Sequence, residues 1–232
     1  IVPILVEGLR RLEYRGYDSA GVAVSDNGLK RVRALGRVAA LSEGIAREKL
    51  AGNTGIAHTR WATHGAPSEG NAHPHISGGL AVVHNGIIEN HESIRARLKA
   101  AGYKFTSETD TEVIAHLVEH YRKEGQDLFA AAVRAVRELE GAFAIAVASA
   151  DAPHNVILAK KGAPILLGLG EGENFAASDV SALLQVTRKV IYLEDGDCAE
   201  ITPDGYRIVD ADGGAAERKV HVSEQSAEAA EL

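Results

Sequence analysis

Apolar residues occur along this chain at two spacings, which separate predicted helices from predicted strands. Between Val2 and Arg15 they stand three or four positions apart, and this predicts an amphipathic helix that ends at Gly16. The same spacing predicts helices over 39–50, 92–101, 110–123 and 127–139, with a short one at 179–184. Short apolar runs between Gly, Pro, Asn and Asp residues predict strands at 21–25, 29–35, 55–57, 80–83, 142–148, 156–160, 165–169, 190–193, 198–201 and 207–209.

The order of these elements predicts an α+β fold. Helices grouped outside mainly antiparallel strands are typical of a layered sandwich. One domain over residues 1–222 is long enough to bury a core of its own. The tail at 223–232 is rich in Ala, Glu and Ser, and we expect a linker there instead of a packed element.

Composition and charge narrow the classes of partner. The 232 residues are 45% hydrophobic and 25% charged, as in an ordinary soluble globular protein. A formal net charge of -7 argues against a nucleic-acid partner, and no apolar run approaches the ~18–20 residues of a membrane span. The single cysteine excludes an internal disulfide framework. We therefore expect a soluble, cytoplasmic protein with no nucleic-acid or membrane partner.

Polar side chains follow two of the predicted strands. A guanidinium can bind a carboxylate through two hydrogen bonds, and an Asn side chain beside a Gly N–H can form a two-donor oxyanion hole. The pattern therefore indicates acyl or amide chemistry on a small carboxylate-bearing substrate, with a loop between the strands that could close as a lid. Each motif also has a structural interpretation, since Asn-Gly is a turn signal and Arg-Trp can form a surface cation–π pair. The candidates are Arg60, Trp61, Thr63 and His64 after the first strand, and Asn85 and Gly86 after the second.

The helix predicted from residue 110 carries two further patterns. Thr109 and Glu112 have the spacing of a capping box, so Asp110 is either a helix cap or a carboxylate that binds a substrate ammonium group. The residues His116–His120 match a zinc-protease pattern, but five-residue patterns arise by chance and no third ligand is evident. We therefore expect no metal site.

Four segments, taken together, resemble a known enzyme family. They read Arg-Leu-Glu-Tyr-Arg-Gly-Tyr-Asp-Ser-Ala-Gly at 11–21, Thr-Arg-Trp-Ala-Thr-His-Gly at 59–65, His-Asn-Gly-Ile-Ile-Glu-Asn at 84–90 and Glu-Thr-Asp-Thr-Glu at 108–112. The chain resembles the glutaminase domain of the glutamine–fructose-6-phosphate aminotransferase (isomerizing) family, also called glucosamine-6-phosphate synthases. The third segment alone would indicate only the wider class II glutamine amidotransferases, whereas the first two indicate the glucosamine branch.

The resemblance implies a fold and the main substrate contacts. The fold is of the N-terminal-nucleophile hydrolase type, a four-layer α/β/β/α sandwich with two antiparallel sheets between helical layers. By resemblance, Arg60 would bind the α-carboxylate of glutamine and Asp110 its α-ammonium group. Asn85 and Gly86 would form the oxyanion hole. The capping interpretation of Asp110 gives way to the binding one.

The resemblance also assigns residues around these contacts. Arg15 would lie beside the catalytic centre. Thr63, His64 and the backbone of Trp61 would line the glutamine pocket, with Trp61 on a loop that closes over it. His73 is either a neighbour of the pocket or a histidine that packs the loop.

The nucleophile of the family is not in the sequence. Members begin with a cysteine whose thiolate attacks the amide and whose α-amino group, with a pKa of about 7.7–8, acts as base. The chain opens on Ile1 and contains no Met, so we expect the opening strand with this cysteine to lie upstream of Ile1. Cys198 lies inside a predicted strand, far in sequence from Arg60, and is expected to be structural.

Two functions remain open. The first is hydrolysis of L-glutamine to L-glutamate and ammonia when the natural N-terminus is present. The ammonia would pass to a C-terminal sugar-phosphate isomerase domain that converts fructose 6-phosphate to glucosamine 6-phosphate. The second is a non-catalytic glutamine-binding module. We favour the first, because oxyanion donors have no evident purpose in a binding module.

The 232-residue chain and the full-length protein are expected to differ in activity and in oligomeric state. The 232 residues alone should bind glutamine or glutamate weakly and hydrolyse nothing. The resemblance implies a homodimer at full length, and it implies no metal or organic cofactor.

Overall fold

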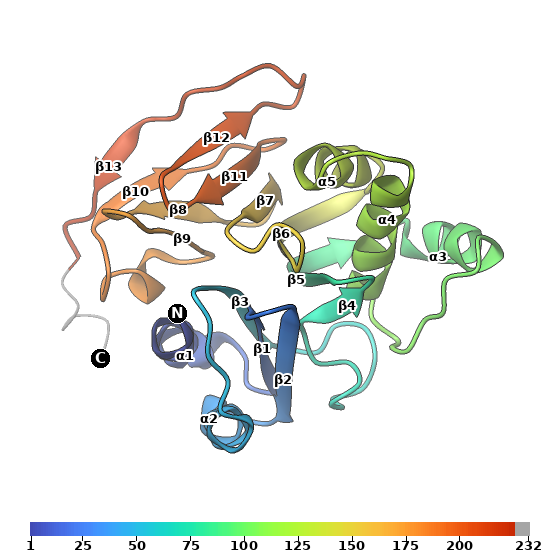
Figure 1. Cartoon of the computed structure of the whole chain (residues 1–232), viewed down its shortest axis with the longest axis horizontal. Coiled ribbons are helices and arrows are strands. Elements are labelled where there is room, and N and C mark those ends of the chain that lie inside the picture. Colours follow the sequence, from blue (N-terminus) through green and yellow to red (C-terminus); the bar gives the residue numbers. More distant parts are fainter. Residues whose placement is uncertain (226–232) are drawn as a thin grey trace.

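The computed structural model describes residues 1–225, which form four layers: helices outside, and strands in the two inner layers (Figure 1). Every ladder between named strands is antiparallel. The arrangement confirms the expected α+β sandwich. Most of the predicted linker at 223–232 lies outside the described residues.

One inner layer is a six-stranded sheet in the order β12-β11-β7-β6-β5-β4, with three helices packed on its outer face through a shared apolar core. Figure 1 shows these helices, in green, on one side of the sheet. The strands are β4 (His75–Ser77), β5 (Leu80–Ile88), β6 (Gly141–Ser149), β7 (Val156–Lys161), β11 (Cys198–Thr202) and β12 (Gly205–Val209). The helices are α3 (His91–Ala100), α4 (Thr111–Lys123) and α5 (Leu128–Arg137).

The other inner layer differs from the single sheet that was expected, because it consists of two separate sheets. These have the orders β2-β1-β3 and β13-β10-β8-β9. Their strands are β1 (Ser19–Ser25), β2 (Leu29–Leu35), β3 (Thr54–Arg60), β8 (Leu166–Leu169), β9 (Asn174–Ala177), β10 (Lys189–Tyr192) and β13 (Val220–Val222). Within residues 1–225, β3 pairs only with β1 and β9 only with β8.

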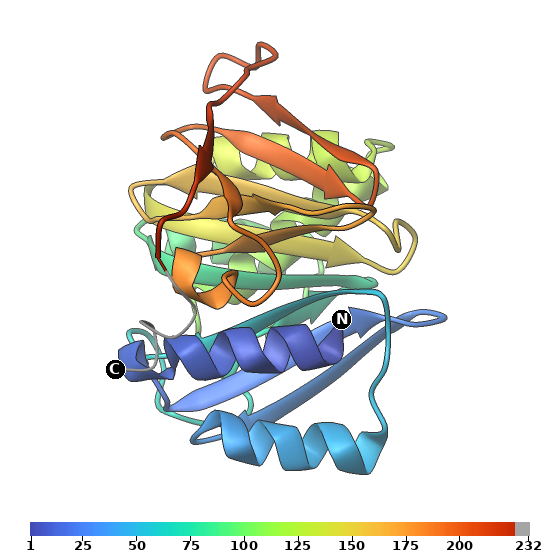
Figure 2. The ribbon, with the colours of Figure 1, turned by 90° about the vertical axis from the view of Figure 1, so that its left-hand side faces the viewer.

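Two helices, with two short 3-10 helices beside them, cover the outer side of this layer. Side chains of α1 (Val2–Leu12) and α2 (Val38–Glu48) form a core with β1 and β2, and Figure 2 shows both helices against these strands. The 3-10 helix η1 (Glu13–Arg15) continues α1, and η2 (Val180–Ala182) packs beside α1 and the four-stranded sheet. No helix within residues 1–225 is both long and apolar enough to cross a membrane.

Burial on both faces explains the apolar strands. β1 is buried at every position from Ser19 to Val24, because helices cover one face and the six-stranded sheet the other. A strand buried on both faces reads as a continuous apolar run instead of an alternating one. This is why the pattern at 21–25 predicts a strand but not which side of it faces the site.

Several predicted elements change in the structure. The strand predicted at 80–83 continues to Ile88, so Asn85 and Gly86 lie inside β5, paired with β6, and not after its end. The capping box is wrong, because Glu112 accepts hydrogen bonds from the backbone of Thr106 and Ser107 instead of Thr109. Three short strands, β4, β9 and β13, were not predicted. β4 and β13 have only three residues each, and β9 has a single large apolar residue, Phe175, so none of them shows a period.

Candidate active site

A cavity of about 350 Å³ is lined by all nine residues that the sequence analysis placed around a glutamine substrate. It lies where the end of β3, the middle of β5 and the beginning of α4 meet. The sequence-predicted residues that line it are Arg15, Arg60, Trp61, Thr63, His64, His73, Asn85, Gly86 and Asp110. Residues that lie far apart in the chain, from Arg15 to Asp110, therefore line one cavity.

Asn85 and Gly86 present polar groups to this cavity from β5. The Oδ1 atom of Asn85 lies 2.9 Å from Nε2 of His58 on the neighbouring layer. Because a carbonyl oxygen only accepts, His58 must donate here, and both hydrogens of the Asn85 amide nitrogen remain for another acceptor. Gly86 has φ of +121°, and a Cβ there would lie 2.0 Å from the carbonyl oxygen of Ala142. Only glycine fits this position in the strand.

Arg60 is buried at the end of β3, with 4% of its surface exposed. Its guanidinium donates to the carbonyl oxygens of His64, of Gly65 at 3.0 Å and of Ala66 at 3.4 Å. Burial lowers the pKa of Arg60 from its usual value, while the nearby carboxylates of Asp18 and Asp110 act in the opposite direction. A cation held by neutral carbonyls next to a cavity is suited to bind an anion there.

Asp110 lies at the beginning of α4, and its side chain does not cap the helix. Its Oδ2 accepts a hydrogen bond of 2.8 Å from the backbone N–H of Ile88, which ties α4 to the end of β5. The residue is 4% exposed and lines the same cavity as Arg60. A buried carboxylate that shares a cavity with a buried guanidinium is complementary to a zwitterion such as an α-amino acid.

Trp61 and Arg15 lie at the mouth of the cavity. The Trp61 side chain is 64% exposed and makes an edge-on contact with Tyr17, with ring centroids 6.5 Å apart. Arg15 donates from Nη2 to the hydroxyl of Ser178 at 2.6 Å, which joins η1 to the segment after β9. An exposed indole at the rim can cover a bound ligand without breaking core contacts.

A protein-family model for the glutamine amidotransferase domain matches residues 58–185, more than half of the chain. The chain belongs to this family. The glutamine–fructose-6-phosphate aminotransferase (isomerizing) of Pseudomonas aeruginosa is 58% identical over 234 residues, and that of Haemophilus influenzae is 55% identical over 233. Each match covers 100% of this chain, and the chain spans 38% of the length of these relatives.

Solved structures agree with the fold of this amidotransferase domain. Glutamine phosphoribosylpyrophosphate amidotransferase from B. subtilis superposes with a TM-score of 0.75 at 25% identity, over 90% of this chain and 46% of that one. A class-II glutamine aminotransferase domain protein from Silicibacter pomeroyi gives a TM-score of 0.59 at 17% identity, over 83% of this chain and 91% of that one. The likeness confirms the N-terminal-nucleophile type of fold expected from the sequence.

Buried histidines in and next to the cavity were largely missed in the sequence. His73 was named as a pocket neighbour, but His58, His75 and His84 were not. The rings of His58 and His73 stack at 4.1 Å, and those of His73 and His75 lie 5.0 Å apart. Burial lowers the pKa of His58 and of His84 to about 4 and that of His75 to about 3. The available signal was positional, since His58 and His84 lie just before candidate residues on β3 and β5.

Hydrogen bonds define which ring nitrogen carries the proton in two of these neutral histidines, His73 and His84. The backbone N–H of His84 donates to Nδ1 of His73 at 3.4 Å, so His73 carries its proton on Nε2. That nitrogen lies 3.2 Å from the hydroxyl of Thr111, which lies 2.9 Å from Nδ1 of His84. Thr111 therefore accepts from His73 and donates to His84. This network joins β5 to the first turn of α4, and so supports Asp110.

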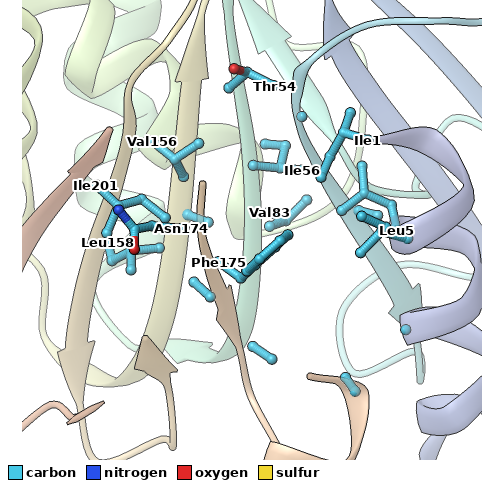
Figure 3. Close-up of a pocket in the computed structure, with 18 of the residues that line it drawn as sticks. Ile1, Leu5, Thr54, Ile56, Val83, Val156, Leu158, Asn174, Phe175 and Ile201 are labelled. Atoms are coloured by element: carbon cyan, nitrogen blue, oxygen red, sulfur yellow. The ribbon is translucent and has the colours of Figure 1, made fainter. Parts of the chain in front are cut away.

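A second, larger cavity of about 590 Å³ adjoins the first and lies between β3 and β9. Figure 3 shows its mainly apolar wall, with Ile56 of β3, Phe175 of β9 and Leu5 of α1. His58, Asn85 and Ser178 line both cavities. The larger cavity therefore runs along the unpaired edges of two strands toward the amide group of Asn85.

Neither the free thiol nor the metal-like pattern contributes to these cavities. Cys198 lies in the core under the helices, and burial raises the pKa of its thiol to about 11, too high for a nucleophile at neutral pH. Ser77 hydrogen-bonds both His116 and Glu119, which therefore serve to fasten α4 to β4. Among the described residues no group of three side chains could hold a metal ion.

Proposed function

We propose that this domain hydrolyses the side-chain amide of L-glutamine to L-glutamate and ammonia. The observation that carries the proposal is the single cavity that the Asn85–Gly86 pair shares with Arg60 and Asp110. An α-amino acid bound by its charged ends would place its side chain toward the two oxyanion donors. Curated relatives that match the whole chain bear the name glutamine–fructose-6-phosphate aminotransferase, which supports glutamine as the nitrogen donor.

The binding contacts are assigned from the charges of the cavity residues and from their positions on its lining. Arg60 would pair with the α-carboxylate and Asp110 with the α-ammonium group. Thr63, His64 and the backbone of Trp61 would line the space around the substrate. The buried carboxylate of Asp110 has one oxygen bonded to Ile88, so its other oxygen is left to accept from the ammonium group.

The remaining residues act around the reacting centre. Arg15 would lie beside it, held by its bond to Ser178. His73, which lines the cavity and stacks on His58, would be a neighbour of the bound substrate.

We propose that the nucleophile is a cysteine at the head of a strand that precedes Ile1 and occupies the larger cavity. The cavity is lined by the free edges of β3 and β9, extends to Asn85, and has Ile1 on its wall. The backbone nitrogen of Ile1 donates to the carbonyl oxygen of Gly52 at 2.9 Å, just before β3 begins and at the end of the strand away from Arg60. A strand of about seven residues, at ~3.3 Å each, would cover the length of β3 and bring its first residue to the oxyanion donors.

The proposed reaction proceeds through a thioester on this cysteine. Its thiolate would attack the amide carbon, and the oxygen would become an oxyanion held by the Asn85 side chain and the Gly86 N–H. The α-amino group of the same cysteine would take the proton from the thiol. Collapse of the tetrahedral intermediate would then transfer this proton to the leaving nitrogen, expel ammonia and leave a thioester. Water would then hydrolyse the thioester to glutamate and restore the thiol.

We further propose that the ammonia passes to a sugar-phosphate isomerase domain of the same full-length protein, where fructose 6-phosphate becomes glucosamine 6-phosphate. Support comes from the relatives, of whose length the chain spans 38%. A homodimer at full length is part of the same proposal.

The test compares the full-length enzyme with its Asn85→Ala variant. Loss of one oxyanion donor should lower kcat for glutamine hydrolysis about 10²–10³-fold with a much smaller change in KM. The matched control is Asn155→Ala, which removes an amide that lines neither cavity and donates to Glu200. If the full-length protein binds glutamine but releases no ammonia, the domain is a glutamine-binding module and not a hydrolase. Unchanged turnover in Asn85→Ala would refute the oxyanion role.

A further inference from the structure

We propose that Asn71 is a positioning residue that sets the separation between Arg60 and Asp110 and so makes the site selective for α-amino acids. The inference rests on the proposed binding of glutamine by these two residues. It adds a residue that lines neither cavity.

The Asn71 side chain bridges the two loops that meet at the cavity. Its Nδ2 donates to the carbonyl oxygen of Ala66 at 2.9 Å and to Oε2 of Glu108 at 3.1 Å. Its Oδ1 accepts from the backbone N–H of Glu108 at 2.9 Å. The residue is 3% exposed, so these bonds are shielded from water.

Each end of the bridge continues directly to a binding residue. On one side, the carbonyl oxygen of Ala66 is also an acceptor for the Arg60 guanidinium. On the other side, Glu108 stands two residues before Asp110. A shift of Asn71 would therefore change both loops together, and with them the span between the two charged groups.

The bridge is built tightly and is held from outside the cavity. At Gly65, φ is +79° and a Cβ would lie 2.6 Å from Nδ2 of Asn71, so only glycine allows the approach. Arg33 of β2 donates to the carbonyl oxygens of Gly70 at 3.2 Å and Ala72 at 3.0 Å, which fixes the chain on both sides of Asn71. The position of the carboxamide is thus set before any substrate binds.

A carboxamide is required because the bridge needs donors and an acceptor on one short side chain. Aspartate would keep the bond to the Glu108 N–H but would place its second oxygen against the Glu108 carboxylate and the Ala66 carbonyl. Repulsion would then separate the two loops. Asn71→Asp should therefore weaken the binding of the amino acid while leaving Asn85 and Gly86 in place.

The experiment measures glutamine hydrolysis by the full-length enzyme. In Asn71→Asp we expect KM for glutamine to rise about ten- to hundredfold, which corresponds to the loss of one or two hydrogen bonds between the enzyme and the charged groups of the substrate. The value of kcat should change much less. A second variant, Asn71→Ala, removes the bonds without bringing two oxygens together and should raise KM less. Inhibition by 4-carbamoylbutanoate, which lacks the α-ammonium group, should weaken less than glutamine binding, so selectivity falls.

A compensating second substitution and a matched control variant distinguish a positioning role of Asn71 from general destabilisation of the protein. In the double variant Asn71→Asp/Glu108→Gln, the amide introduced at position 108 can donate to the new carboxylate. This removes the repulsion at position 108 but not the one at the Ala66 carbonyl, so KM should return part of the way to wild type. Asn155→Asp makes the same change at an amide that donates to Glu200 at 2.9 Å, outside both cavities, and should leave KM unchanged.

The outcomes distinguish this inference from the proposed function. If the wild-type enzyme neither binds nor hydrolyses glutamine, the proposed function fails. If the wild type is active and Asn71→Asp keeps its KM, or Asn155→Asp raises KM equally, the positioning role is overturned.

Discussion

At the scale of single residues, the oxyanion donor depends on a histidine that burial keeps neutral. His58 donates from Nε2 to the Asn85 side chain, and this orients the amide nitrogen of Asn85 away from His58. Desolvation lowers the pKa of His58 to about 4, with a smaller effect of its hydrogen bond in the opposite direction. A protonated His58 would have to place a second N–H, and its charge, in a buried layer.

The buried His58 predicts a loss of stability in acid. Its pKa in the folded state, about 4, lies below the ordinary histidine value of 6.5, so the unfolded chain binds more protons in between. The stabilisation is complete above pH 6.5 and is lost as the pH falls to 4, by about 3 kcal/mol for this residue. We expect the free energy of unfolding, measured with urea, to fall more steeply over this range in the wild type than in His58→Gln.

The control for this prediction is an exposed histidine. His154→Gln removes a solvated imidazole and should leave the wild-type pH profile unchanged. Parallel profiles for the wild type and His58→Gln would contradict the assignment of a neutral, buried His58.

At the scale of elements, the ladder between β5 and β6 determines where the site can form. The ladder continues past Asn85 and Gly86 to Ile88, so the candidate oxyanion donors stand on a paired strand and not on a loop. Groups fixed on a strand hold their geometry better than groups on a loop. The positive φ of Gly86 turns its peptide within the strand without ending it.

Substitution of Gly86 tests this arrangement. Gly86→Ala would drive a Cβ into the Ala142 carbonyl and should leave little folded protein in urea titrations. Gly28→Ala is the matched control, because φ there is +124° but no atom lies within 4 Å of the added Cβ. It should cost only the conformational strain, about 1–2 kcal/mol. Equal losses in both variants would show that the close approach to β6 is unimportant.

At the scale of the whole molecule, the site lies where two sheets of one inner layer meet, β2-β1-β3 and β13-β10-β8-β9. We call the boundary between β3 and β9 the seam. β3 reaches the cavity with one edge paired to β1 and the other facing the apolar cavity beside β9. An unpaired edge leaves alternate backbone groups without a ladder partner. The seam is therefore a region where the described residues are weakly constrained by hydrogen bonds.

Hydrogen exchange on this chain should reveal the seam. Amides of β3 that point toward β1 should be protected, and alternate amides that point toward the cavity should exchange much faster. The segment 144–148 of β6 is the internal control, since it pairs with β5 on one side and β7 on the other and should be protected throughout. In the full-length protein the fast amides of β3 should become slow if a strand fills the cavity. Uniform protection of β3 in the present chain would contradict the free edge.

The period of the apolar residues was sufficient to predict most elements. Longer elements such as α4 and β6 carry enough side chains for their spacing to be unambiguous, whereas β4 and β9 do not. The chain motifs around Arg60, Asn85 and Asp110 were visible because unusual polar residues interrupt apolar runs. Histidines on β3 and β5 were missed, since a single histidine in a strand does not show what it will face.

The sequence by itself determined the residue types, the approximate elements and the family. Those depend on local spacing and on motifs that are contiguous in the chain. Tertiary structure alone decided that Asn85 receives its hydrogen bond from His58, that Asn71 joins the loops of Arg60 and Asp110, and that one inner layer is divided at β3. The reason is that these contacts join residues far apart in the chain, whose distances are set by the packing of layers and not by any local preference of the chain.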